Sequence, residues 1–232
     1  MNLVSDHFFV FDSISLNEVH SKLYGFVVDE TGVHTKNNVG NLSGNGCYVQ
    51  ITVDDDIIKI EQDSNGSFGL YLYRDGDYFA ISNSFFRLQD FLKTRVKLSA
   101  NNDYIYQFLA LDMCSLAYSE TAIKEIEWID RNAVLIINRH NKQLRFELED
   151  EAVNTISLES ELGIQVLDKW FARWSRIMKG IRNSTNRITI DLSGGFDSRL
   201  VFLLLKASGC DLNGIRVHSA ISDNKVHKED YE

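Results

Sequence analysis

The sequence contains no proline among its 232 residues and only three cysteines. The absence of proline excludes stiff proline-rich linkers, so turns must depend on glycine, asparagine and aspartate. The cysteines Cys47, Cys114 and Cys210 lie far apart and form no CxxC pair, so we expect neither a disulfide framework nor a zinc site. This sparse use of cysteine is typical of the reducing cytosol, and we expect a cytoplasmic protein.

Positive charge and long apolar runs are also scarce. Lys and Arg total 24 against 33 Asp and Glu, which gives a formal net charge of −9. A chain this acidic lacks the basic surface that nucleic acid or an anionic membrane would attract. No stretch approaches the roughly 18 consecutive apolar residues of a membrane span, and the N-terminus lacks the basic start of a signal peptide. We therefore expect no nucleic-acid partner and no membrane association.

The rest of the composition is that of a folded globular protein, with 44% hydrophobic and 25% charged residues. Period-two alternation and turn signals predict a mainly β first half with two hairpins, the first turning at Asp75-Gly76. The expected strands lie at residues 7–12, 47–53, 56–62, 68–74, 77–82, 132–138 and 142–148. Helices are expected at residues 84–93 and 103–118, and a turn-rich loop is expected at residues 31–46.

The hydrophobic period changes from 2 to 3.6 after a polar stretch at residues 149–155. An apolar stripe from Leu158 to Ile181 predicts one long helix, with Trp170 and Trp174 packed in a core. A β run, an apolar helix and a second β run at 214–219 follow, which is the opening unit of a doubly wound parallel sheet. We predict an α+β domain of antiparallel sheets over residues 1–150, then the start of an α/β domain over 156–232.

The loop between the first of these β runs and its helix carries the clearest chemistry. A helix N-terminus exposes about four backbone N–H groups and the positive end of the helix dipole. Gly194 and Gly195 have no Cβ, so their amides can approach an anion closely, and Ser193 and Ser198 add hydroxyl groups. This combination predicts a cradle for phosphate or pyrophosphate. Asp197 would repel a bare phosphate, but it fits a site where it faces Mg²⁺ or an amine nucleophile.

A simpler interpretation competes with this one. The glycines can form a tight strand-to-helix turn in which Ser193 and Asp197 only cap the helix. The pattern also differs from the Walker loop, because no lysine follows the glycines, and from GxGxxG. The whole hexamer SGGFDS at residues 193–198 nevertheless resembles the PP-loop SGGxDS of the ATP pyrophosphatase superfamily at every fixed position, and within it the asparagine synthetase family. The resemblance extends over about residues 45–232 and is strong only at 188–200.

The resemblance implies a fold, a reaction and a set of site residues. The fold would be an Ntn-amidotransferase-like N-terminal domain followed by a PP-loop domain. The reaction would use ATP and Mg²⁺ to adenylate a small-molecule or peptide carboxylate, which ammonia or an amine then attacks. Ser193 and Asp197 would take part in catalysis, and Asp197 would hold the metal. The nucleotide would be bound by Leu192, Ser193, Gly194, Gly195, Asp197, Ser198 and Ser219.

The sequence also departs from that family. A glutaminase of this type needs a cysteine at its mature N-terminus, whereas position 2 is Asn2 and Cys47 fits a small buried residue on a strand. We therefore predict a degenerate amidotransferase domain without glutaminase activity. About 35 residues follow Ser198, where the family has roughly two hundred, which predicts a fragment of a longer protein rather than a truncated inert gene. His218 is interpreted as a structural strand residue.

Two other functions stay open at this point. The chain could be a non-catalytic binding or scaffold protein that retains a relic PP-loop. It could also perform another PP-loop chemistry, such as sulfur transfer. The mainly β first half has no place in those architectures, and a tRNA substrate would prefer a basic surface.

Overall fold

A computed structural model describes residues 7–35, 45–111, 119–148, 155–185, 187–193 and 195–219 of the chain. The chain divides into two compact units. The N-terminal unit comprises Met1–Val27 and Thr35–Glu151, and the C-terminal unit comprises Val28–His34 and Ala152–Glu232. Within the described residues, no helix combines the length and the apolar character that crossing a membrane requires.

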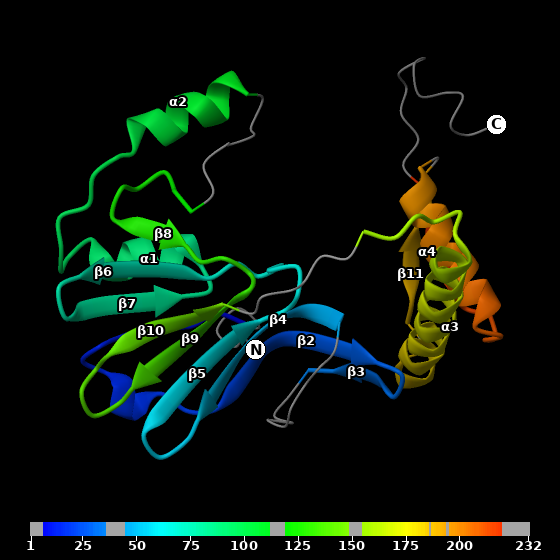
Figure 1. The fold of residues 1–232 in the computed structure, drawn as a ribbon, viewed down its shortest axis with the longest axis horizontal. Helices are drawn as coiled ribbons and strands as arrows, with labels where there is room; N and C mark the ends of the chain where they lie inside the picture. The colour runs from blue at the N-terminus through cyan, green and yellow to red at the C-terminus, as the bar shows by residue number, and fades with distance from the viewer. Residues whose placement is uncertain are drawn as a thin grey trace. The chain divides into compact units, whose positions relative to one another are not determined.

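The N-terminal unit is a mixed α+β structure built on antiparallel sheets (Figure 1). A four-stranded sheet has the order β1-β7-β6-β8, and a larger sheet has the order β10-β9-β5-β4-β2-β3. The strands of the first sheet are β1 (Val10–Asp12), β6 (Tyr71–Asp75), β7 (Tyr78–Ser82) and β8 (Ile126–Trp128). Those of the second are β2 (Lys22–Asp29), β3 (Gly32–His34), β4 (Asn45–Val53), β5 (Ile57–Gln62), β9 (Ala133–Asn138) and β10 (Leu144–Leu148).

Both predicted hairpins are confirmed. Strands β6 and β7 pair with Asp75 opposite Tyr78, so the two turn residues are Gly76 and Asp77, one position later than the expected Asp75-Gly76. Gly76 has φ +57°, which a residue without a Cβ adopts at little cost. Strands β9 and β10 pair with Ile137 opposite Leu144.

The hydrophobic core of this unit draws on both sheets. Alternate residues of β4, β5 and β9 contribute Ile51, Ile60 and Leu135, which are fully buried beside Leu72 and Ile81 of the four-stranded sheet. Because strand side chains point alternately to opposite faces, Tyr73 and Ala80 face the other way. They pack against the buried side of helix α1 (Phe85–Leu92). Helix α2 (Asn102–Ala110) follows, with Asn101 as its N-cap.

The sequence did not predict three of the strands, β2, β3 and β8. Strand β3 lies within the loop predicted at residues 31–46. Residues 36–44 of that loop lie outside the described residues, and so do residues 112–118 of the helix expected at 103–118. Strand β2 is interrupted by Gly25, whose φ of +101° breaks the alternation that reveals a strand. Strand β8 has only three residues, too few for a periodic pattern.

The C-terminal unit contains α3 (Glu161–Ser184), β11 (Thr189–Asp191), α4 (Phe196–Ala207) and β12 (Arg216–His218). Strands β11 and β12 are parallel, with Ile190 opposite Val217, and α4 connects them. The expected order of long helix, strand, helix and parallel strand is therefore present. Ser160 caps α3 by accepting a hydrogen bond from the amide of Gly163 at 3.0 Å.

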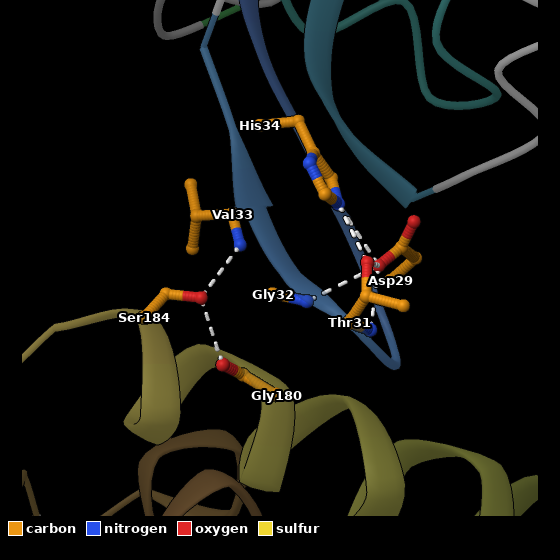
Figure 2. A network of polar contacts seen from close by, with 7 residues as sticks. All are labelled: Asp29, Thr31, Gly32, Val33, His34, Gly180 and Ser184. Carbon is orange, nitrogen blue, oxygen red and sulfur yellow. Dashed lines mark hydrogen bonds and ion pairs between the residues drawn. The ribbon is translucent and has the colours of Figure 1, made fainter.

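The tip of the β2–β3 hairpin belongs to this unit and contacts the C-terminal end of α3 (Figure 2). The hydroxyl of Ser184 accepts from the amide of Val33 at 3.2 Å and donates to the carbonyl of Gly180 at 2.9 Å. A Cβ on Gly180 would lie 2.6 Å from the carbonyl oxygen of Glu30. The hairpin can therefore approach α3 this closely only because Gly180 has no side chain.

The carboxylate of Asp29 organises the turn of the same hairpin. Its Oδ1 accepts from the amide of Thr31 at 2.7 Å, from the Thr31 hydroxyl at 2.6 Å and from the amide of Gly32 at 3.2 Å. It also pairs with Nε2 of His34 at 3.0 Å. The hydrogen bonds from Thr31 and then His34 hold the pKa of Asp29 far below its usual value.

The expectation that Trp170 and Trp174 are core residues is wrong for Trp170, which is 40% exposed. The two rings contact each other with centroids 6.2 Å apart, and only Gly163, Ile177 and Gly180 of α3 are buried. An apolar stripe is buried only where another element covers it. Within the described residues, the N-terminal half of α3 has little such cover.

Candidate functional site

The candidate site is the loop that joins β11 to α4. Strand β11 ends at Asp191, and α4 begins at Phe196 with Gly195 in an extended conformation as its N-cap. The sequence predicts a helix start near Asp197 or Ser198, and the observed start lies one residue before the first of these. Gly194 lies outside the described residues.

A cluster of hydroxyl contacts closes this loop on itself. The Oγ atoms of Ser193 and Ser198 lie 3.1 Å apart, and Ser198 Oγ also lies 3.1 Å from the carbonyl of Ser193 and 3.2 Å from that of Gly195. A hydroxyl has one proton, so Ser198 donates to only one of these oxygens at a time. The two serines of the hexamer therefore form one hydrogen-bonded cluster, in which the Ser198 hydroxyl can donate to any of several nearby oxygens.

The loop amides behave differently from the helix amides. The amide of Ser193 donates to Ser198 Oγ at 3.1 Å, and that of Gly195 donates to Ser193 Oγ at 3.3 Å. An anion at these two amides must therefore displace the serine hydroxyls. The first-turn amides of α4, from Phe196 to Ser198, have no acceptor among the described residues. They are the N–H groups that a helix start leaves without an intrahelical partner, so they would form the accessible part of the predicted cradle.

Asp197 lies in this first turn and is exposed, as is the side chain of Phe196 at 88%. A carboxylate is a suitable oxygen ligand for Mg²⁺. Among the described residues, no group of three or more His, Cys, Asp or Glu side chains could hold a metal ion. A single carboxylate at Asp197 could hold Mg²⁺ only together with ligands from outside the described residues, such as phosphate oxygens and water.

The two parallel strands bring the remaining predicted residues to one edge. The amide of Leu192 donates to the carbonyl of His218 at 2.8 Å, and exposed Ser219 follows the end of β12. The carboxyl ends of parallel strands form the usual ligand edge of an open α/β sheet. Leu192, Ser193 and Ser219 therefore lie at the same edge, as the sequence predicts for neighbouring strand ends.

The same edge carries a pair that the sequence analysis did not identify. Asp191 stands opposite His218 in the strand register, and Asp191 Oδ1 lies 3.0 Å from His218 Nδ1. Both residues are the last of their strands. The sequence signal that could have indicated this pair is a polar residue at the end of each short apolar strand, directly before a loop.

Cys47, on β4, shows no sign of being an activated nucleophile. Burial raises the pKa of its thiol, and the negative charge of Asp63 raises it further. The carboxylate of Asp63 is buried and accepts from the amides of Tyr48 and Ser67. A reactive cysteine needs a lowered pKa and a positive environment. Cys114 lies outside the described residues, and Cys210 is half-buried and unpaired.

Comparisons with known proteins add little to this geometry. No protein-family model matches the sequence, and no curated protein matches it. One solved structure that matches is the glutamine phosphoribosylpyrophosphate (PRPP) amidotransferase from B. subtilis complexed with ADP and GMP. The match has 12% sequence identity and a TM-score of 0.25, and it covers 81% of this chain and 37% of that one. This chain thus spans well under half of that enzyme, and so low a TM-score carries no argument about fold or activity.

Proposed function

We propose that this chain is part of an ATP-dependent amide-forming ligase similar to the asparagine synthetases. A carboxylate would attack ATP with release of pyrophosphate, and ammonia or an amine would then attack the acyl adenylate to give an amide and AMP. Activation is needed because oxide is a very poor leaving group and AMP is a good one. The observation that carries the proposal is the hexamer SGGFDS at residues 193–198, placed between a parallel strand and the start of a helix.

Most of the predicted residues would have a role in this reaction. The first-turn amides of α4 and the hydroxyls of Ser193 and Ser198 would stabilise the charge that develops on the pyrophosphate. Asp197 would hold Mg²⁺ beside the phosphates, and Leu192 and Ser219 would offer backbone groups to the nucleotide. Mg²⁺ would neutralise part of the phosphate charge.

The nitrogen would come from free ammonia or from a substrate amine. Burial and the charge of Asp63 disfavour the thiolate of Cys47, so this cysteine lacks the activation that a glutaminase nucleophile needs. The shared core of the two N-terminal sheets supports an Ntn-amidotransferase-like fold for this domain, which we propose to lack glutaminase activity.

A second candidate is a non-catalytic binding or scaffold protein with a relic PP-loop. The observation in its favour is that the amides of Ser193 and Gly195 already donate to hydroxyls of their own loop. A loop that stays closed in this way would not bind phosphate.

Binding of Mg-ATP to the full-length protein, measured by thermal shift and by calorimetry, separates the two candidates. A ligand present at a hundred times its Kd stabilises the folded state by about 2.7 kcal/mol, so binding by the wild type should raise Tm measurably. We expect Ser193→Ala and Asp197→Asn to weaken Mg-ATP binding at least about tenfold. Ser208→Ala, at the other end of α4, is the matched control and should change nothing.

Measuring ATP binding without Mg²⁺ tests the role of Asp197. Without Mg²⁺ its carboxylate repels the phosphates, so Asp197→Asn should bind ATP at least as tightly as the wild type does. Turnover should yield AMP and pyrophosphate, whereas ADP and phosphate would refute the ligase chemistry. The absence of any thermal shift at millimolar Mg-ATP would favour the scaffold instead.

A further inference from the structure

The pair formed by Asp191 and His218 lies beside the candidate loop but is not needed to build it. Asp191 precedes Ser193 by two residues, and the His218 carbonyl accepts the amide of Leu192, directly before the loop. The imidazole therefore sits on the strand next to the one that leads into the phosphate cradle. Both side chains point to the same face of the two-stranded sheet, since they stand opposite each other in register.

Asp191 fixes which nitrogen of His218 carries the proton. Because Asp191 Oδ1 lies 3.0 Å from Nδ1, that nitrogen is the donor and holds the hydrogen. In the neutral ring Nε2 then carries the lone pair, which is the tautomer of a histidine prepared to accept a proton. Nε2 has no hydrogen-bond partner among the described residues, and the His218 side chain is 68% exposed, so a substrate can reach it.

The pair contributes little to holding the fold together. The side chains of Asp191 and His218 are 87% and 68% exposed, and ion pairs this exposed contribute little to stability. The N-terminal unit contains a comparable exposed pair, in which Asp56 Oδ1 lies 2.5 Å from Nε2 of His140. That pair joins two turns remote in sequence from the loop, so it provides a matched control.

We infer that His218, oriented by Asp191, is the general base for the nitrogen nucleophile, an inference that rests on the proposed ligase function. As the amine attacks the acyl carbon, the new C–N bond forms and an N–H proton passes to Nε2 of His218. The bond between the acyl carbon and the phosphate oxygen then breaks, and AMP leaves with the electron pair. His218 finally returns its proton to water. Asp191 is a positioning residue, because it acts only through the imidazole.

Measuring the two half-reactions, adenylation and transfer to nitrogen, tests this inference separately from the ligase function on which it rests. Adenylation, measured as ATP–pyrophosphate exchange with L-aspartate, an aspartate-containing peptide and glucuronate as probes, needs no base for nitrogen. Transfer to ammonia needs one, because the attacking nitrogen must lose a proton as the amide forms. General acid–base groups contribute typically 10²–10⁴-fold. We therefore expect His218→Gln to lower ammonia transfer about 100-fold, while exchange stays near wild type.

The outcomes are distinct. His140→Gln should leave both exchange and ammonia transfer unchanged, and Asp191→Asn should lower ammonia transfer about tenfold. Exchange by the wild type together with unaltered ammonia transfer in His218→Gln would overturn the role of His218 and leave the ligase function standing. A wild type without exchange on any of the three probes would overturn the ligase function and the base with it.

A measurement without substrate tests the role of Asp191. Nitrogen-15 NMR of the full-length protein should show His218 with its proton on Nδ1, and Asp191→Asn should shift the population toward the Nε2–H form. An unchanged tautomer in Asp191→Asn would overturn the positioning role, since a purely structural contact does not need to select one nitrogen. The His140 resonances report on the control pair in the same spectra.

Discussion

The two units of this chain use apolar residues in opposite ways. In the N-terminal unit, apolar residues from two sheets meet in one continuous core. In the described part of the C-terminal unit, the buried apolar residues are Ile177, Ile190, Leu204 and Leu205, whereas many of their neighbours are exposed. The large exposed ones are Leu158, Leu162, Ile164, Val166, Leu167, Trp170, Phe171, Phe196, Leu200, Val201, Leu203 and Val217.

The difference shows what a layered fold requires. Two antiparallel sheets can bury their inner faces against each other, and α1 covers the outer face of one of them. A parallel sheet needs helices on both faces, and the parallel sheet in the described part of the C-terminal unit has only two strands. An apolar cavity of about 310 Å³ also remains there, lined among others by Met178, Ile190 and Val201. The site thus lies on the less tightly packed unit.

The largest expected effect is the removal of a core side chain from the well-packed unit. Leu135→Ala should lower the free energy of unfolding by about 3–5 kcal/mol, because a fully buried leucine leaves a cavity that the close-packed core cannot fill. Leu204→Ala, on α4, should cost about 2 kcal/mol, because its sparser surroundings can collapse. Urea unfolding, with hydrogen exchange to resolve the units, measures both.

The exposed Leu148→Ala and Leu203→Ala are the matched controls and should stay within about 0.5 kcal/mol of the wild type. Equal losses for Leu135→Ala and Leu204→Ala would break the comparison, since the two units would then be packed equally well.

A smaller effect is expected where the β2–β3 hairpin meets α3. In Gly180→Ala the new Cβ would meet backbone atoms of Glu30 and Asp29, at 2.6 Å and 2.9 Å. Overpacking of this kind costs about 1–3 kcal/mol, whereas the gain in helix propensity is about 1 kcal/mol. The clash should win, and the amide of Val33 should exchange faster as the hairpin separates from Ser184.

Lys179→Ala, one residue earlier on an exposed position, gains propensity without a clash and should be neutral or stabilising. If Gly180→Ala were equally stable, the close contact between the hairpin and α3 would be wrong.

The smallest effect concerns pH. The hydrogen bonds from Thr31 and His34 place the pKa of Asp29 in the folded state below its unfolded value of about 4. The stabilisation is therefore fully present above pH 4 and is lost as the pH falls through that value toward the lower folded one. With a side chain 41% exposed, its size should stay below about 1 kcal/mol.

Urea unfolding between pH 6 and pH 3 measures this loss, and Asp29→Asn should flatten the curve. Asp55→Asn, an exposed carboxylate of the other unit, should not. A curve that keeps its full slope in Asp29→Asn would show that the hairpin carboxylate is not linked to folding.

Particular elements show how far the sequence could be interpreted. Alternation and Asp75-Gly76 were enough for the β6–β7 hairpin, and the 3.6-residue period was enough for α3. Strand β2 stayed hidden because Gly25 breaks its pattern, and the exposure of Trp170 could not be foreseen because a stripe does not say what covers it. In the candidate site, the hexamer marked Ser193 and Asp197, whereas the pairing of Asp191 with His218 needed the strand register.

Local chemistry alone decided where strands turn, where α3 runs and where a helix start follows two glycines, because these depend on neighbours within a few residues. The tertiary structure decided which apolar faces are covered, how closely the hairpin approaches Gly180 and that the loop hydroxyls occupy the amides of Ser193 and Gly195. It also placed an aspartate and a histidine 27 residues apart within 3.0 Å. Such contacts depend on how distant segments pack, which the order of residues does not display.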